Sequence, residues 1–276
     1  MTEFLLALKE NPLLLTALLA GLASSVVSGI IGSYVVVKRI VFISGSISHS
    51  VLSGIGLFLW LSRVHGIVWL SPLYGALLAG VLSALLIGWI HLYYREREDT
   101  VIAALWSIGM AIGVLFISQT PGFNVELTNF LVGNILWVSS HDLYLLLGLD
   151  VVIIAIAVCL HKQFLAICFD EDQARLQGLN VNALYLFLLV LTSITIVLLI
   201  QVVGIILVMT MLAIPAAIAN LFTCKLSRMI WIAIGLGFGF CFFGMSTAYQ
   251  LDWPPGATIA LLSGAVYLFA MLLHKK

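Results

Sequence analysis

The charged residues of this chain are gathered in a few short segments, and long stretches without any charge separate them. No Asp, Glu, Lys or Arg occurs in residues 40–62, 64–94, 100–125, 176–224, 229–251 or 253–274. A helix needs about 20 apolar residues to cross the ~30 Å hydrocarbon core of a membrane, so each stretch can hold a span and residues 176–224 can hold two. The sequence therefore predicts a chain that crosses a membrane many times.

The composition excludes several other classes of protein. Hydrophobic residues make up 63% of the chain and charged residues 9%, whereas a soluble domain has about 45–50% and about 25%. A soluble globular domain and a disordered chain are therefore excluded. The formal net charge is zero, and nothing in it indicates a nucleic-acid partner.

We expect an all-α polytopic membrane protein with about eight or nine transmembrane helices, forming a single domain over residues 1–276. Long apolar runs without alternation favour helices over a barrel. The predicted spans are 13–36, 42–61, 69–92, 100–118, 142–160, 183–201, 203–221, 229–247 and 256–273. Residues 120–141 carry prolines, glycines and asparagines, and we expect a loop with a short re-entrant or interfacial helix there.

The basic residues predict how the chain is oriented in the membrane. In the nine-span arrangement most of them fall on one side, which the positive-inside rule identifies as the cytoplasm. The C-terminus is then inside and the N-terminus outside. We expect a multi-pass protein of the cytoplasmic (inner) membrane in contact with membrane lipid.

The second predicted span carries a polar stripe. Ser46, His49, Ser50 and Ser53 are spaced i, i+3, i+4 and i+7, which places them on one helical face. Such a stripe faces protein or water rather than lipid. Either it lines the path of a polar solute, with His49 binding a cation through its neutral imidazole, or its serines bond to carbonyls of the preceding turn and His49 bonds to a neighbouring helix.

Asp150 falls within the fifth predicted span. A carboxylate at the bilayer centre costs about 2.5–3.5 kcal/mol on insertion scales, and such residues are functional candidates. The alternative is a helix that starts later and leaves Asp150 near the outer interface.

The longest polar stretch contains a short predicted helix at about residues 169–179. Asp170 and Glu171 stand where negative charge stabilises a helix N-terminus, and Gly178 can end the helix. Such an element is either a docking site for a partner protein or a capped surface helix. The chain lacks the GxxxxGK[ST] phosphate-binding motif, so any use of ATP requires another subunit.

Six segments, in order, resemble the membrane permease subunits of metal-cation ABC importers, the family that serves zinc, manganese and iron uptake. They are Val36–Arg39 with Ser48–Gly54, which is similar to a basic pair followed by G-D-A-L-S-H-A-V-L-P-G; Glu98–Gly113; Leu131–Leu136; Phe169–Gly178, which is similar to F-D-x-x-x-A-x-x-x-G; Gly204–Ala217; and Tyr249–Ala257. The resemblance covers nearly the whole chain.

The resemblance implies a transporter subunit rather than an enzyme. Two permeases, either two copies or a copy and a paralogue, would form the pore. Cytosolic ATP-binding subunits would dock on the coupling helix through Asp170, Glu171, Ala174 and Gly178, and an extracytoplasmic metal-binding protein would deliver the ion. His49 takes the position of the family's metal-contacting histidine, and the divalent metal is the substrate, with no resident cofactor.

One departure from the family pattern concerns the metal. With His49 aligned, the family's usual acid falls at Gly45 and its glycine at Ser44. Carboxylates suit manganese, while imidazole suits zinc and iron, so the sequence favours zinc, followed by manganese or iron. Asp150 is the second candidate metal contact, and Ser46, Ser50 and Ser53 are candidates for the pathway.

Three rival functions stay open on the sequence. The first is an importer of the same type for iron chelates or vitamins. The second is an intramembrane enzyme, for which a serine near His49 lacks an evident orienting group. The third is a channel or carrier that works without ATP.

Overall fold

The computed structural model describes residues 2–67, 69–94, 98–122, 135 and 138–274, and this part of the chain is helical without a strand. It contains nine helices that are long and apolar enough to cross a membrane. They are α2 (Pro12–Val37), α3 (Val41–Val64), α4 (Pro72–Tyr93), α5 (Glu98–Ser118), α7 (Ser140–Phe169), α9 (Val181–Val203), α10 (Ile205–Phe222), α11 (Leu226–Leu251) and α12 (Pro255–Leu273). Two shorter helices, α1 (Thr2–Glu10) and α8 (Glu171–Leu176), complete the described set. The predicted fold class is confirmed.

Local sequence signals place the helix ends. Asn11 accepts a hydrogen bond from the backbone N–H of Leu13 at 3.0 Å and caps α2, which begins at Pro12. Ser71 caps α4 before Pro72 in the same way. Gly204 has φ +83° and separates α9 from α10, a conformation that glycine adopts at little cost.

All nine predicted spans correspond to described helices, and most ends agree within a few residues. The exception is the fifth span, predicted to end at residue 160, whereas α7 continues to Phe169. Polar residues such as Lys162 mark where a helix leaves the apolar layer. They do not interrupt its backbone hydrogen bonds, so hydropathy underestimates a helix that extends past the membrane. Most of the predicted loop at 120–141 lies outside the described residues.

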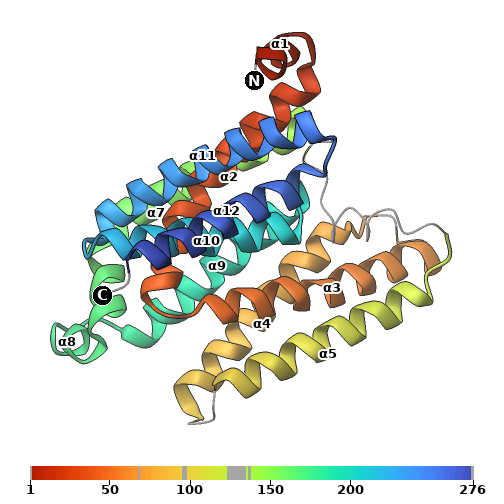
Figure 1. The fold of residues 1–276 in the computed structure, drawn as a ribbon. Helices are drawn as coiled ribbons and strands as arrows, with labels where there is room; N and C mark the ends of the chain where they lie inside the picture. The colour runs from red at the N-terminus through yellow and green to blue at the C-terminus, as the bar shows by residue number, and fades with distance from the viewer. Residues whose placement is uncertain (1, 68, 95–97, 123–134, 136–137, 275–276) are drawn as a thin grey trace. The chain divides into compact units, whose positions relative to one another are not determined.

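The chain divides into two compact units, each described by itself. Unit 1 comprises residues 1–39, 128–165 and 199–276, and unit 2 comprises residues 40–127 and 166–198. In unit 1, α2 packs against α10 and α11, and α12 packs against both (Figure 1). Gly29 allows α2 to approach the backbone of Ile234 on α11, where an added Cβ would lie 2.9 Å from the amide nitrogen.

In unit 2, α3 lies beside both α4 and α5 (Figure 1). Two glycines of α3 bring the backbones together, because an added Cβ at Gly54 would collide with the carbonyl of Gly75 on α4, and one at Gly56 would lie 2.7 Å from the carbonyl of Gly113 on α5. Both glycines therefore permit close approach of the helices.

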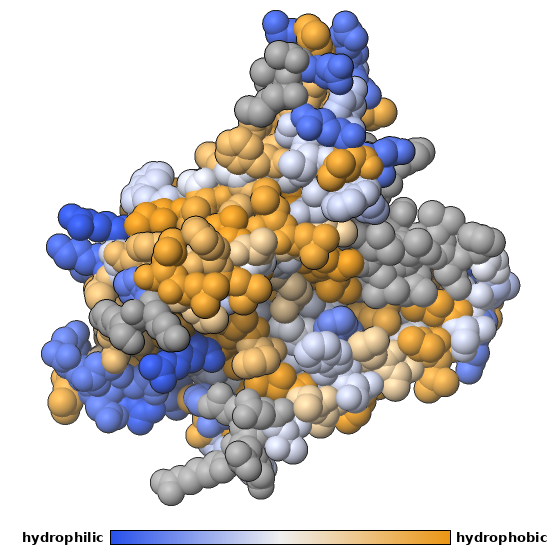
Figure 2. Space-filling view, in the orientation of Figure 1, coloured by the Kyte–Doolittle hydropathy of each residue, from blue (hydrophilic) through white to orange (hydrophobic). Residues whose placement is uncertain are grey.

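The distribution of hydrophobic side chains on the surface is typical of a membrane protein. Figure 2 shows hydrophobic side chains gathered over α11 and α12, and hydrophilic side chains around α8 and around α1. Large apolar residues of these helices, such as Trp231 on α11 and Leu261 and Phe269 on α12, are exposed. A hydrocarbon layer would cover them, in agreement with a multi-pass membrane protein.

Candidate functional site

The serines of the predicted stripe hold α3 against α5. The Ser46 hydroxyl donates to the carbonyl of Ile102 on α5 at 3.0 Å. The Ser50 hydroxyl lies within hydrogen-bond distance of two carbonyls, that of Ser46 at 2.8 Å and that of Leu105 on α5 at 3.2 Å. Ser53 bonds back to the carbonyl of Ser50 at 2.7 Å. Ser46 and Ser50 are buried, so this part of the stripe faces a neighbouring helix.

His49 lies on the same face of α3 but is only half-buried. Its imidazole stacks on the indole of Trp106 on α5, with ring centroids 4.3 Å apart and an angle of 10° between the planes. Stacking uses the ring face, and a cation binds imidazole through a nitrogen lone pair in the ring plane. The arrangement therefore orients His49 and leaves its nitrogen edge for a ligand.

Four residues before His49, where the family pattern has an acid, this chain has a tightly packed stretch of α3. Gly45 is buried between Ser44 and Ser46. The Ser44 hydroxyl donates to the carbonyl of Val41 at 2.6 Å. Both flanking serines use their hydroxyls within the helix pair, so neither replaces a carboxylate beside His49.

Asp150 lies inside α7, and the alternative that the helix starts after it is wrong. The helix begins at Ser140, which puts Asp150 about 15 Å along its axis. The side chain is 7% exposed, and its Oδ1 atom has no hydrogen-bond partner among the described residues. The carboxyl also lies by the backbone of Val27 on α2. Burying a carboxylate with one oxygen lacking a hydrogen bond costs free energy, which makes Asp150 a candidate functional residue.

The two candidate metal contacts belong to different units, His49 to unit 2 and Asp150 to unit 1. Within the described part of the chain, no three His, Cys, Asp or Glu side chains gather as they would around a tightly held metal ion. A single histidine or carboxylate holds a metal weakly, and weak binding is compatible with passage of an ion rather than storage.

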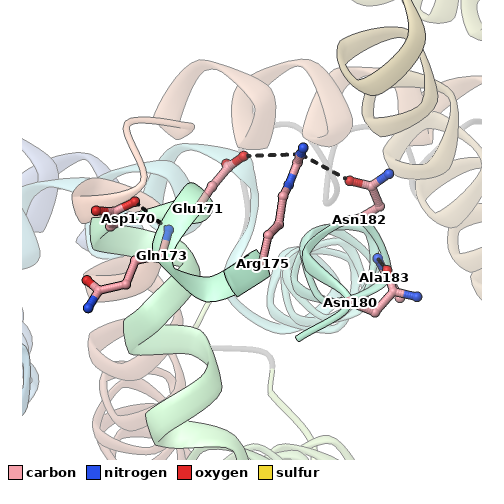
Figure 3. A network of polar contacts seen from close by, with 7 residues as sticks. All are labelled: Asp170, Glu171, Gln173, Arg175, Asn180, Asn182 and Ala183. Carbon is pink, nitrogen blue, oxygen red and sulfur yellow. Dashed lines mark hydrogen bonds and ion pairs between the residues drawn. The ribbon is translucent and has the colours of Figure 1, made fainter. Parts of the chain in front are cut away.

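The predicted coupling helix is present as α8, between α7 and α9 (Figure 3). Asp170 is its N-cap, and its carboxylate accepts a hydrogen bond from the backbone N–H of Gln173 at 2.9 Å. Glu171 lies 4.0 Å from Arg175, which also reaches Asn182 of α9 at 3.5 Å. These contacts join α8 to the start of α9.

Ala174 and Gly178 shape the end of this element. Ala174 is buried, and its carbonyl accepts a hydrogen bond from the N–H of Leu179 at 3.1 Å. Gly178 has φ +82°, which permits this reversal after a helix. A short, hydrogen-bonded connection therefore joins α8 to α9.

Sequence reasoning missed three residues at these places. Trp106 was part of a motif but was not assigned to His49, because nothing in the sequence indicates which residue of α5 faces it. Leu176 at the end of α8 is 89% exposed, and Phe169 just before α8 is exposed too. The available signal was an apolar residue in an otherwise polar helix, a pattern typical of docking surfaces.

Comparison with known proteins agrees with the sequence resemblance. The model of the ABC 3 transport family matches residues 10–274. A probable metal transport system membrane protein of Chlamydia trachomatis is 49% identical over 96% of this chain and 90% of its own length. The manganese transport system membrane protein MntC of Listeria monocytogenes is 32% identical over 99% of this chain and 95% of its own.

A solved structure has the same fold. The structure of PsaBC from Streptococcus pneumoniae in complex with Fab matches with a TM-score of 0.85 and 29% identity, covering 98% of this chain and 95% of that one. This chain is therefore similar in fold to that solved structure.

Proposed function

Because the chain belongs to the ABC 3 transport family, we propose that it is the membrane permease subunit of an ATP-driven importer of divalent metal ions, with residues 1–276 acting as one permease domain. The observation that carries the proposal is the family match over residues 10–274, together with a membrane-spanning helix set. The names of relatives that span nearly the whole chain refer to metal transport.

The proposed partners supply functions for which this chain carries no motif. It has no phosphate-binding loop for ATP, so cytosolic ATP-binding subunits supply the energy by docking on α8. An extracytoplasmic binding protein delivers the metal, and a second permease, identical or paralogous, completes the pore. No resident cofactor and no enzymatic step are needed, since the metal is the substrate.

For the metal we propose manganese first and zinc second. Relatives named for a single metal include manganese systems, and the match to MntC of Listeria monocytogenes covers 95% of the length of that protein. The sequence alone favoured zinc, because Gly45 takes the place of the usual acid beside His49. A half-buried imidazole oriented by Trp106 is compatible with either ion, and the names of the relatives support placing manganese first.

The mechanism uses the described contacts. ATP binding and hydrolysis in the partner move α8, and the bonds from Arg175 and Leu179 pass that movement to the start of α9. The pathway opens alternately to each side of the membrane. The metal passes His49 and is attracted by the charge of Asp150, while Ser46, Ser50 and Ser53 shape the wall of α3 beside it.

The experiment is uptake of radioactive manganese, zinc and iron, each offered separately, in cells that depend on this chain. His49→Ala and the double variant Asp170→Lys/Glu171→Lys are compared with the unchanged chain at equal protein levels. His65→Ala, at the end of the same helix, is the matched control for loss of an imidazole.

We expect both test variants to lose uptake of the same metal and the control to retain it. Full uptake with His49→Ala would remove this residue from the pathway. An unchanged chain that takes up iron chelates but no free ion would replace the proposal with the chelate importer, and uptake that persists without ATP would replace it with a carrier.

A further inference from the structure

Three helices of unit 1 enclose an apolar groove. It is a cavity of about 540 Å³ bounded by α2, α7 and α11, which we call the α2/α7/α11 groove. Its lining is almost entirely aliphatic and aromatic and includes Val26, Ile30, Val158, Trp231, Ile234 and Phe238. Neither of the candidate metal contacts lines it.

The groove is open along its side. Val158 on α7 is 74% exposed and Trp231 on α11 is 75% exposed, although both line the cavity. Side chains exposed at this depth of membrane-spanning helices meet either lipid or another protein.

The length of the groove matches one leaflet of a membrane. Along α11 it extends from Ser227 to Phe238, which at about 1.5 Å per residue is about 16 Å. The hydrocarbon core is ~30 Å thick. A transmembrane helix of a partner would contact the surface over both leaflets, whereas the acyl chain of a lipid occupies one.

One end of the groove is polar. The hydroxyl of Tyr34 on α2 lies 3.0 Å from Nδ1 of His161 on α7, and Nε2 of His161 lies 3.1 Å from the hydroxyl of Ser227 on α11. All three residues line the cavity. This end lies near Lys38, which follows the last residue of α2, and near Lys162 of α7, on the side that the positive-inside rule assigns to the cytoplasm.

Two cations stand beside that polar end. Lys162 follows His161 and Arg228 follows Ser227, both are exposed, and neither forms an ion pair with a described residue. The acidic residues of α7 and α11 lie away from this end: Asp142 starts α7, Asp150 precedes His161 by about 16 Å along α7, and Asp252 follows the last residue of α11. The polar end therefore presents positive charge next to an apolar slot.

We propose that the α2/α7/α11 groove binds one anionic phospholipid of the cytoplasmic leaflet, with an acyl chain in the groove and the phosphate near Lys162, Arg228 and Ser227. An anionic headgroup complements the two cations, and basic clusters between helices on the cytoplasmic side are a recurring lipid-recognition arrangement. The site does not depend on which metal the protein carries.

The test is native mass spectrometry of the full chain, purified in detergent and titrated with phosphatidylglycerol or phosphatidylcholine of the same acyl composition. We expect the first phosphatidylglycerol to bind about tenfold or more tightly than phosphatidylcholine, because two cations contribute to the headgroup contact. Equal binding of the two lipids would overturn the proposal.

Two variants and their matched controls locate the site. Ala157→Phe fills the groove from α7, whereas Ala155→Phe adds the same ring to an exposed position that does not line it. Lys162→Gln/Arg228→Gln removes the cations, whereas Lys9→Gln removes one from α1. We expect both test variants to lose the preferred lipid and both controls to keep it. Preferred binding that survives in the two test variants would place the lipid elsewhere and overturn the proposal.

A second copy of this chain is the competing occupant. With the natural cysteines replaced by serine, Trp231→Cys chains in membrane vesicles are treated with an oxidant. We expect no disulfide-linked dimer, since a lipid covers this face. A disulfide-linked dimer would show that another copy of the chain covers the groove and would overturn the proposal.

Discussion

The imidazole of His49 on α3 and the indole of Trp106 on α5 form a stacked pair, 4.3 Å between centroids and 10° from parallel. The pair positions the one histidine of the predicted stripe with its nitrogen edge unobstructed by the stacking partner. It connects two residues that are far apart in the sequence.

We expect Trp106→Leu to reduce metal uptake several-fold and Trp106→Phe to retain most of it. An aromatic ring beside imidazole contributes about 0.5–1.5 kcal/mol beyond its buried area, and leucine offers no flat face to orient the ring. The measurement is initial uptake rate at equal protein level. Identical rates for the leucine and phenylalanine variants would show that the stacking is only packing.

We expect Asp150→Asn to raise the thermal midpoint while abolishing uptake. The change removes a charge that is costly inside the membrane, on the order of 2.5–3.5 kcal/mol on insertion scales, and keeps the shape of the side chain. Thermal unfolding in detergent and uptake are measured on the same preparation. Asp142→Asn, at the exposed start of α7, is the control and should keep its uptake; retained uptake in Asp150→Asn would exclude the carboxylate from transport.

We expect Gly109→Ala to destabilise the protein by about 1–3 kcal/mol, the usual range for overpacking. An added Cβ on α5 would lie 2.6 Å from the Cα of Ser50 on α3, so the helices must separate. Gly239→Ala in α11, with nothing within 4 Å of the added carbon, is the matched control. Equal thermal midpoints for the two variants would contradict the close contact between α3 and α5.

We expect Leu176→Ala to leave the thermal midpoint unchanged and to reduce co-purification of the ATP-binding subunit. The side chain is 89% exposed, so it contributes little to the fold, while exposed apolar residues at an interface often supply its anchors. Leu268→Ala on the outer face of α12 is the control for losing an exposed leucine. Undiminished co-purification would exclude Leu176 from the docking surface.

We expect Gly178→Ala to cost about 1 kcal/mol and Gly178→Asn less, because φ is +82° there and asparagine tolerates such a conformation better than alanine. Nothing lies within 4 Å of an added Cβ, so the effect is one of backbone strain alone. Thermal unfolding measures the cost, and ATPase stimulation by the permease measures its effect on coupling. An alanine variant as stable as the unchanged chain would contradict the strained reversal.

Much of the fold was predictable because the membrane restricts what a chain can do. Charge-free windows placed the described spans other than α7, which contains Asp150. Asp170 with Gly178 placed the ends of α8, since capping depends on local sequence alone. The predicted C-terminal end of α7 was too early, because the backbone hydrogen bonds of a helix continue past the membrane surface.

The sequence by itself determined the class of the protein, the number and order of its described spans, and the short helix between α7 and α9. These features depend on the cost of burying charge in hydrocarbon and on local helix capping. Both can be inferred from the order of residues along the chain. Only the tertiary structure decided that Ser46 and Ser50 bond to α5, that Trp106 stacks on His49, and that Tyr34, His161 and Ser227 meet at one end of a groove. These contacts join residues distant along the chain, and the rotation of each helix about its axis is set by packing against its neighbours, which no local pattern encodes.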